Sequence, residues 1–379
     1  MLKLNETYLE LDLTEQQSAL YHYVWLRDNC QCSECMHPDT GERILVTADI
    51  ADGIAPVSAQ LNDDQNGLSI EWNQASHKSE YAISWLQDHN YSNSNTSFNI
   101  DPAYSELILW GKELENKIPT FDYQALRDDS QTLLDWCCAV RDYGLTIVRN
   151  APTVEGEIER FADFVAVVRE TIYDRLHNVR ATPGEYNAYN VASTTLELKP
   201  HTDMPNYNNP PGVQMFHFLI NESEGGESTA VDGFKVAAQL KDQDLQAYET
   251  LASTDVTFRM NSARGDIIGS NPLLTLDTSG ALKVFRFSNQ LAQPSNMPAD
   301  KVDAFYHAYR KLGKLLEAPE NKIQFKLGTG DIMVTNNLRV LHGRNSYNPA
   351  SGGRHLQLSY MDMDDVMSRI RMLLKEQAA

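Results

Sequence analysis

Alternation of apolar and polar residues predicts short strands near the N-terminus. Residues 8–13 (YLELDL) and 68–72 (LSIEW) place every second apolar side chain on one face, which is typical of half-buried β-strands. Asn66 and Gly67 immediately precede the second segment, and this dipeptide favours a turn between short strands. We therefore predict a small β-rich unit over residues 1–100.

The rest of the chain combines a few helices with many short strands. The apolar residues of 131–142 fall on one helical face, so Cys137 and Cys138 are expected to pack in or beside a core. Further helices are predicted at about 155–176 and 298–316. Apolar runs punctuated by Gly and Pro predict strands at 145–148, 213–220, 228–231, 256–260, 281–287, 323–327, 331–335 and 355–360.

This arrangement indicates a mainly β fold with added helices, an α+β architecture. A series of short strands favours a closed or double-sheet β structure such as a jelly roll. Residues 90–119 lack strong periodicity and begin with a run of Asn and Ser. We therefore expect a small domain over 1–100, a linker over 101–119 and a larger domain over 120–379.

Composition excludes several classes of partner. The chain has 379 residues, 42% of them hydrophobic, and a formal net charge of −20. Such acidity argues against nucleic acid or an anionic membrane surface as a partner. The N-terminus has no apolar signal region, and no run of eighteen apolar residues occurs. We expect a cytoplasmic protein.

Cys30, Cys32 and Cys35 form a cluster of three thiols within six residues. In a reducing compartment such a cluster indicates metal binding rather than disulfides, although three reduced buried cysteines without metal are an alternative. A structural zinc needs a fourth ligand. His37 is too close to Cys35 for comfortable closure, whereas His77 could connect the two ends of the unit. The histidines in this part of the chain are His22, His37, His77 and His89.

His201 and Asp203 flank a single residue, so both side chains point to the same side of an extended segment. With one further histidine they would complete the 2-His-1-carboxylate triad that holds non-haem Fe(II) and leaves positions open. His342, after a predicted turn and strand, is the best candidate. His217 in an apolar strand and His307 in a helix fit core or surface roles better.

Arg354 adds a feature that points to a 2-oxo acid. Such an acid can chelate the iron and supply electrons, and its far carboxylate then needs a fixed cation. Arg354 lies twelve residues after His342 at the start of a predicted strand, and a guanidinium binds a carboxylate through two hydrogen bonds. A lone arginine more often forms a surface salt bridge, but the joint pattern is a much stronger signal.

Five motifs together resemble the γ-butyrobetaine hydroxylase group of Fe(II)/2-oxoglutarate dioxygenases, whose wider family includes trimethyllysine dioxygenase and taurine dioxygenase-like enzymes. The resemblance spans nearly the whole chain. It implies a small zinc-binding domain in front of a double-stranded β-helix, or jelly roll. The motifs are WLRDNC at 25–30, HTD at 201–203, PPGVQ at 210–214, VDGF at 231–234 and DDVMSR at 364–369.

The resemblance also implies the roles of particular residues. Arg354 matches the 2-oxoglutarate anchor, and Ser228 falls where relatives place a hydroxyl near the same co-substrate. Relatives are commonly dimers, so a homodimer is expected, and we expect ascorbate to stimulate activity. The metal ligands implied are His201, Asp203 and His342 for Fe(II), and Cys30, Cys32, Cys35 and His77 for structural Zn(II).

An aromatic cage for a trimethylammonium head is also implied by the resemblance. Tyr173 and Tyr360 agree with the family, whereas His177 stands where an aromatic residue is usual and Ser193 replaces a tyrosine. Three other tyrosines could substitute for the missing ring, or could simply be packing or surface residues. These are Tyr186, Tyr189 and Tyr207.

At the other end of the substrate, Asn190 and Asn289 match asparagines that hold a carboxylate in the family. If Arg286 faces the pocket it would suit a more highly charged anion such as a phosphonate, and if it points outward a carboxylate remains sensible. Strand alternation puts Arg286 and Ser288 on one face and Asn289 on the other, so Arg286 and Asn289 cannot both serve without a bulge.

The function expected is C–H hydroxylation of a small quaternary ammonium substrate with O₂ and 2-oxoglutarate. γ-Butyrobetaine is the default substrate, converted to carnitine, and a trimethylammonium alkylphosphonate or trimethyllysine are variants. A hypothesis of another class is a non-enzymatic, cupin-like domain that senses a metal or ligand. The complete triad and Arg354 argue against it.

Overall fold

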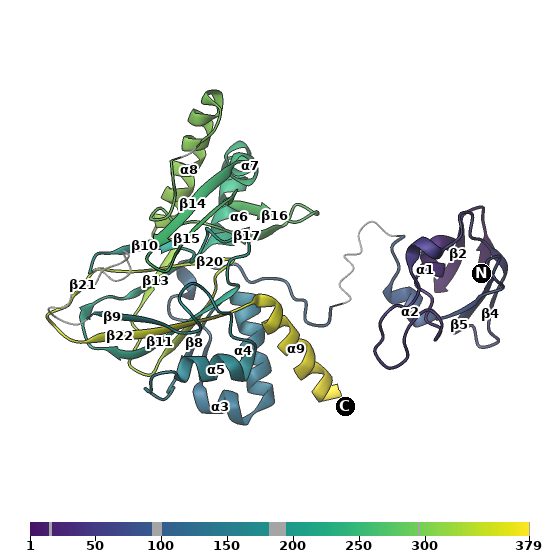
Figure 1. The fold of residues 1–379 in the computed structure, drawn as a ribbon, viewed down its shortest axis with the longest axis horizontal. Coiled ribbons are helices and arrows are strands. Elements are labelled where there is room, and N and C mark those ends of the chain that lie inside the picture. The colour runs from purple at the N-terminus through teal and green to yellow at the C-terminus, as the bar shows by residue number, and fades with distance from the viewer. Residues whose placement is uncertain (15–16, 93–100, 182–194, 295, 379) are drawn as a thin grey trace. The chain divides into compact units, whose positions relative to one another are not determined.

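The computed structural model describes residues 1–378 apart from 15–16, 93–100, 182–194 and 295. Contacts within the chain divide it into two compact units, Met1–Tyr104 and Ser105–Ala379, whose elements are labelled in Figure 1. Among the described residues, no helix is long and apolar enough to cross a membrane.

The first unit, which we call the N-terminal unit, contains two three-stranded antiparallel sheets, ordered β1-β2-β3 and β4-β5-β6. The predicted alternation is confirmed, since Leu9, Leu11 and Ile70 are buried in one core. The predicted turn at Asn66 and Gly67 joins β4 to β5. The elements are β1 (Leu2–Leu4), β2 (Tyr8–Thr14), β3 (Gln17–His22), α1 (Tyr23–Asp28), β4 (Pro56–Leu61), β5 (Gly67–Trp72), β6 (Lys78–Ala82) and α2 (Ile83–Asp88).

The second unit, which we call the C-terminal unit, is built on a four-stranded and a six-stranded sheet. Their orders are β10-β20-β13-β18 and β7-β8-β19-β11-β22-β9. All pairs are antiparallel except β7–β8. The strands are β7 (Thr120–Asp122), β8 (Leu145–Arg149), β9 (His177–Ala181), β10 (Leu198–His201), β11 (Val213–Asn221), β13 (Ser228–Asp232), β18 (Lys322–Phe325), β19 (Ile332–Asn336), β20 (Val340–Arg344) and β22 (Arg354–Met361).

Helices and hairpins complete the C-terminal unit. α4 begins at the Asp129 cap, whose side chain accepts the Thr132 N–H, and ends at Gly144, whose φ of 70° is left-handed. α6, α7 and α8 share a core with β14, β16 and β17. The elements are α3 (Tyr123–Asp128), α4 (Ser130–Tyr143), α5 (Glu157–Val165), β12 (Glu224–Gly225), α6 (Gly233–Gln243), α7 (Leu245–Ser253), β14 (Asp255–Ser262), β15 (Gly265–Pro272), β16 (Leu274–Leu276), β17 (Leu282–Phe285), α8 (Val302–Glu317), β21 (Tyr347–Asn348) and α9 (Met363–Ala378).

Two predicted elements differ from those observed. The helix expected over 155–176 ends at Val165, because the following segment runs beside β22, where the Arg169 N–H donates to the Tyr360 carbonyl at 2.8 Å. The strand expected over 281–287 ends at Phe285. Strand alternation therefore does not apply to the residues that follow it.

The segment expected as a linker over 101–119 is divided between the units, whose boundary falls after Tyr104. Trp110 and Leu114 are buried in a core of the C-terminal unit. The Trp110 N–H donates to the Asp232 carboxylate at 3.1 Å, and Arg339 forms a buried ion pair with the same carboxylate. This part of the segment is therefore packed structure.

Candidate active site

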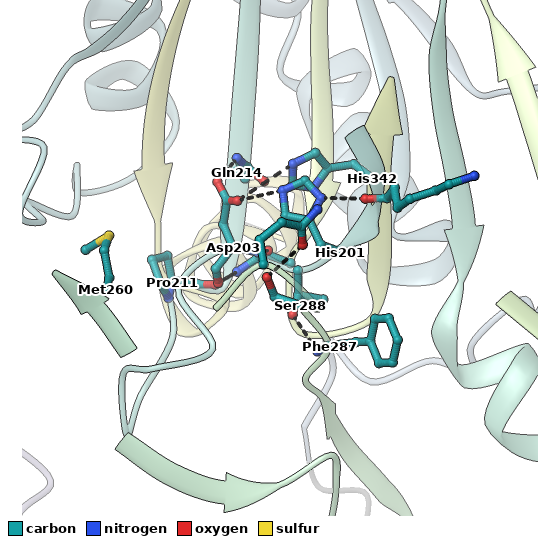
Figure 2. Close-up of polar contacts among 12 residues, drawn as sticks. His201, Asp203, Pro211, Gln214, Met260, Phe287, Ser288 and His342 are labelled. Carbon is teal, nitrogen blue, oxygen red and sulfur yellow. Dashed lines mark hydrogen bonds and ion pairs between the residues drawn. The ribbon is translucent and has the colours of Figure 1, made fainter. Parts of the chain in front are cut away.

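Strand pairing brings the three predicted iron ligands together. His201, at the end of β10, lies opposite His342 on β20, and their ring centroids are 4.3 Å apart. Asp203 follows two residues later, with Oδ1 3.3 Å from His201 Nε2 and 3.8 Å from His342 Nε2 (Figure 2). Neighbouring ligands of an octahedral ion with bonds of about 2.1 Å are about 3.0 Å apart. The cluster thus has the spacing of a slightly open metal site.

The protonation states of this cluster suit a divalent cation. His201 Nδ1 lies 3.0 Å from the Lys199 carbonyl and can only donate to it, which orients Nε2 towards Asp203. Burial, and to a smaller extent the neighbouring His201, lowers the pKa of His342 to about 3. Burial alone would raise the pKa of the Asp203 carboxyl, but a hydrogen bond from His201 and the nearby His342 hold it well below its usual range. A neutral His342 imidazole and an ionised Asp203 carboxylate result.

A cavity of about 180 Å³ extends from this cluster. Residues of both large sheets line it, so it lies between the four-stranded and six-stranded sheets. Most of its wall is apolar, which excludes water from the metal cluster. The apolar lining residues are Val179, Leu198, Met204, Phe216, Phe218, Met260, Leu291, Met333, Leu356 and Leu358.

The predicted anchor Arg354 and the predicted hydroxyl of Ser228 both line this cavity. Arg354 is 7% exposed, and its Nε has no hydrogen-bond partner among the described residues. Burial lowers the pKa of Arg354 to about 9, with a smaller contribution from the neighbouring Arg344. Arg354 is still a cation at neutral pH. It therefore presents unused donors to an anionic ligand.

Three of the predicted cage residues also line the cavity. Tyr173 and His177 are in contact, with ring centroids 4.2 Å apart, and the Tyr173 hydroxyl donates to Met260 Sδ at 3.0 Å. Tyr360, on β22, donates its hydroxyl to Asp203 Oδ2 at 2.8 Å. Burial lowers the pKa of His177, which favours its neutral form.

The structure places other predicted substrate residues outside the cavity lining. Arg286 donates to Thr275 Oγ1 at 2.6 Å and to the Asn208 carbonyl at 3.1 Å. Asn289 is exposed and accepts a hydrogen bond from Tyr309 at 2.6 Å. Neither residue is among those that line the cavity, and the strand that would have directed them ends at Phe285. Tyr207 does not line the cavity either, and four predicted residues lie outside the described part of the chain: Tyr186, Tyr189, Asn190 and Ser193.

Residues without a predicted role support the metal cluster. Gln214 donates an amide hydrogen to Asp203 Oδ2. Asn337 accepts the Asp203 N–H at 2.7 Å and donates to its carbonyl at 3.0 Å. Arg344, two residues after His342 on the same strand, lines the cavity. Residues two apart on a strand share a face, so the sequence could have placed Arg344 beside His342. A single Gln or Asn offers no such spacing.

The N-terminal unit contains the predicted thiol cluster. His77 Nε2 lies 3.4 Å from Cys30 Sγ, 3.6 Å from Cys32 Sγ and 3.5 Å from Cys35 Sγ. In tetrahedral zinc sites the usual bond lengths put sulfur and nitrogen about 3.6 Å apart. The His77 Nδ1 atom lies 3.4 Å from Glu34 Oε2, a partner of the kind that orients ligating histidines. The four side chains therefore fit a closed zinc site.

Comparisons with protein families cover both units. The family described as "Taurine catabolism dioxygenase TauD, TfdA family" matches residues 100–360. The family described as "Gamma-butyrobetaine hydroxylase-like, N-terminal" matches residues 1–87. The first match includes every residue of the candidate active site, and the second includes the thiol cluster and His77.

Curated relatives match over most of their length. A gamma-butyrobetaine dioxygenase of Pseudomonas sp. (strain AK-1) is 35% identical, covering 93% of this chain and 90% of the relative. The human gamma-butyrobetaine dioxygenase is 31% identical, covering 95% and 92%. A trimethyllysine dioxygenase of Meyerozyma guilliermondii is 28% identical, covering 94% and 91%.

Proposed function

The chain belongs to the TauD/TfdA family of dioxygenases and carries a γ-butyrobetaine hydroxylase-like N-terminal region, and on this premise we propose that it hydroxylates a small trimethylammonium substrate, by default γ-butyrobetaine to carnitine. The observation that carries the proposal is the cluster of His201, Asp203 and His342 in a cavity that also holds Arg354. Membership of this family makes the chain a 2-oxoglutarate-dependent dioxygenase. The alternative of a non-enzymatic sensing domain is set aside.

Each part of the cavity has its own task in this proposal. When bound, Fe(II) and 2-oxoglutarate supply the oxidising chemistry with O₂. His201, Asp203 and His342 hold the metal, and Arg354 with Ser228 binds the far carboxylate of the co-substrate. The apolar wall between them keeps water away from the reacting carbon.

The trimethylammonium head is assigned to the face formed by Tyr173, His177 and Tyr360. A cation without N–H groups cannot donate hydrogen bonds, so aromatic faces provide its attraction. A neutral His177 can act as a further ring in this face. Met260 completes it with a polarizable thioether beside the Tyr173 hydroxyl.

One observation favours γ-butyrobetaine over trimethyllysine. Trimethyllysine carries an additional α-ammonium group, which would need a counter-ion in a buried site. Asp203 is the single carboxylate among the described residues that line the cavity, and it is assigned to the metal. Trimethyllysine remains the second candidate because relatives of that activity are 28–31% identical to this chain. The alkylphosphonate loses support because Arg286 binds elsewhere.

The test is parallel turnover of γ-butyrobetaine, trimethyllysine and trimethylaminoethylphosphonate with Fe(II), 2-oxoglutarate and ascorbate. We expect succinate and hydroxylated product at the highest kcat/KM for γ-butyrobetaine, and loss of both with Asp203→Ala. Higher kcat/KM for another of the three would replace the substrate assignment. Absence of succinate with all of them would contradict the proposed reaction.

Three structural proposals accompany the function. The two large sheets enclose the cavity, and we infer that they are the halves of a double-stranded β-helix. Cys30, Cys32, Cys35 and His77 are proposed to hold one structural Zn(II), which metal analysis would detect at about one ion per chain. The homodimer expected from the resemblance stays a prediction for light scattering, and stimulation by ascorbate stays one for the activity assay.

A further inference from the structure

The two oxygens of the Asp203 carboxylate have different surroundings. Oδ1 faces the Nε2 atoms of His201 and His342, at 3.3 and 3.8 Å. Oδ2 accepts hydrogen bonds from Gln214 Nε2 and from the Tyr360 hydroxyl. Figure 2 shows Gln214 beside this carboxylate, with a dashed line marking their hydrogen bond. One oxygen is thus directed at the metal position and the other is engaged by the protein.

Gln214 is fixed in place by the centre of the six-stranded sheet. It is fully buried on β11, opposite Tyr360 of β22 on one side and Thr335 of β19 on the other. Its Oε1 has no hydrogen-bond partner among the described residues. Turning the amide over would place that oxygen against the Asp203 carboxylate, so the donor orientation is strongly preferred.

Tyr360 acts on the same oxygen from the adjacent strand. Its hydroxyl donates to Asp203 Oδ2 at 2.8 Å. Gln214 Nε2 also lies 3.5 Å from the Tyr360 hydroxyl, so the two donors converge on Oδ2.

The backbone of Asp203 is held by a separate contact. Asn337 binds both its N–H and its C=O and also donates to the Pro211 carbonyl at 3.0 Å. With the backbone fixed in this way, the remaining freedom of Asp203 is rotation of its side chain and carboxylate. Gln214 and Tyr360 are placed to control that rotation.

We propose that Gln214, together with Tyr360, keeps Asp203 a one-oxygen metal ligand and so preserves the coordination position that the co-substrate needs. This inference rests on the proposed iron site. Three protein ligands would leave a six-coordinate ion with three open positions, two of which a chelating 2-oxo acid would need. A carboxylate that bound through both oxygens would occupy one of them. Gln214 is therefore a positioning residue that acts through Asp203.

Loss of the amide donor has a selective consequence. In Gln214→Leu, Asp203 Oδ2 loses its hydrogen bond from the Gln214 amide. The carboxylate can then turn and bind the metal through both oxygens. The metal then gains a ligand atom, so its affinity is retained. The 2-oxo acid must compete with that oxygen, so its affinity falls. If Gln214 only supported Asp203 as a ligand, its loss would instead lower the affinity for the metal, commonly by about 10-fold to 100-fold.

The test measures two affinities without turnover, using Mn(II) in place of iron. Mn(II) binding is followed by electron paramagnetic resonance, and 2-oxoglutarate binding to the Mn(II)-loaded protein by calorimetry. For Gln214→Leu we expect about a tenfold loss of 2-oxoglutarate affinity with Mn(II) affinity kept within about threefold. Unchanged 2-oxoglutarate affinity, or any change in which both affinities fall together, would overturn the inference.

Gln357→Leu is the matched control. Gln357 is a fully buried glutamine of the neighbouring strand β22, but it binds the Gly156 N–H and Asn178 away from the cavity. The same change there should leave both affinities as in the wild type. If the wild type itself bound neither Mn(II) nor 2-oxoglutarate, the proposed iron site would fail, which is distinct from failure of this inference.

A second variant covers the case in which Gln214→Leu does not fold. Tyr360→Phe removes the other donor to Oδ2 with almost no change of volume. Because both measurements are made without the trimethylammonium substrate, its place in the aromatic face does not affect them. We expect the same selective loss of 2-oxoglutarate affinity, smaller than that of Gln214→Leu. No loss would count against control of Oδ2 by these donors.

Discussion

At the scale of single residues, Arg354 is the proposed anchor of the co-substrate. Its guanidinium is buried at the cavity wall, with Nε unpaired among the described residues. Arg354→Met should raise the KM for 2-oxoglutarate by roughly 10-fold to 100-fold, because two charge-assisted hydrogen bonds are lost. Succinate release measured against 2-oxoglutarate concentration tests this.

Arg180→Met is the control for that change. Arg180 lies on the adjacent strand β9 and contacts Glu155 and His355, outside the cavity lining. Its loss should leave the KM for 2-oxoglutarate unchanged. If both variants raised the KM alike, a general effect on the sheet would replace the anchoring role of Arg354.

His217 makes the stability of the C-terminal unit depend on pH. It is fully buried, its two ring nitrogens have no partner among the described residues, and burial lowers its pKa to about 4. The unfolded chain binds this proton near pH 6.5, before the folded chain does. Stability is therefore lost as the pH falls from about 6.5 towards 4, by about 2 kcal/mol at pH 5 from this group alone.

His217→Phe removes that titration and keeps a ring in the core. The difference in free energy of unfolding between pH 7 and pH 5 should be smaller in this variant than in the wild type by about 2 kcal/mol. Urea unfolding followed by near-ultraviolet circular dichroism measures it. Equal pH dependence in the two proteins would mean that His217 takes up its proton inside the folded protein.

A site residue can be recognised from the sequence when only a few residue types can perform its role. The grouping of His201, Asp203, His342 and Arg354 around one cavity could be predicted, because few side chains are suited to iron or to a carboxylate. Gln214 and Asn337 were not, because their role depends on which strand or turn lies beside Asp203. A buried amide has no characteristic spacing, so pairing of β11 with β22 had to be known first.

At the scale of elements, the end of β17 explains why Arg286 does not line the cavity. The strand stops at Phe285, and Arg286 turns away to join Thr275 of β16 to the Asn208 carbonyl. Asn208 belongs to the loop that follows Asp203. Arg286 thus ties the metal-ligand loop to a neighbouring hairpin, a role that strand alternation did not predict.

Arg286→Met should therefore act on the loop and not on anion preference. We expect kcat/KM to fall by a similar factor, about tenfold, for γ-butyrobetaine and for its phosphonate counterpart, because two hydrogen bonds of a buried cation are lost. Thermal unfolding should occur at a lower temperature. A loss confined to the phosphonate would instead return Arg286 to the substrate site.

At the scale of the whole molecule, the chain consists of two units with separate cores and separate clusters of candidate metal ligands. The two-unit organisation was predictable from the β-rich start, the unpatterned middle and the later series of strands. The boundary within 101–119 was not predictable. Trp110 packs in a core of the C-terminal unit, and its backbone N–H donates to Asp232, more than a hundred residues away. Single-sequence periodicity carries no information on such contacts.

Zinc should hold the N-terminal unit together. Cys35 and His77 are 42 residues apart in the chain, and the cluster joins the end of α1 to the hairpin of β5 and β6. A unit of this size buries little apolar surface, so metal binding contributes much of its folding free energy. Cys35→Ser replaces a thiolate with a poor zinc ligand.

In Cys35→Ser we expect zinc content to fall from about one ion per chain to near zero. Limited proteolysis should then cleave within Met1–Tyr104, while the C-terminal unit keeps its Mn(II) and 2-oxoglutarate binding. Cys138→Ser, the same change at a half-buried helical cysteine outside the cluster, should keep both zinc and protection. Retained zinc in Cys35→Ser, or cleavage that spreads equally through both units, would contradict a zinc site that stabilises the N-terminal unit alone.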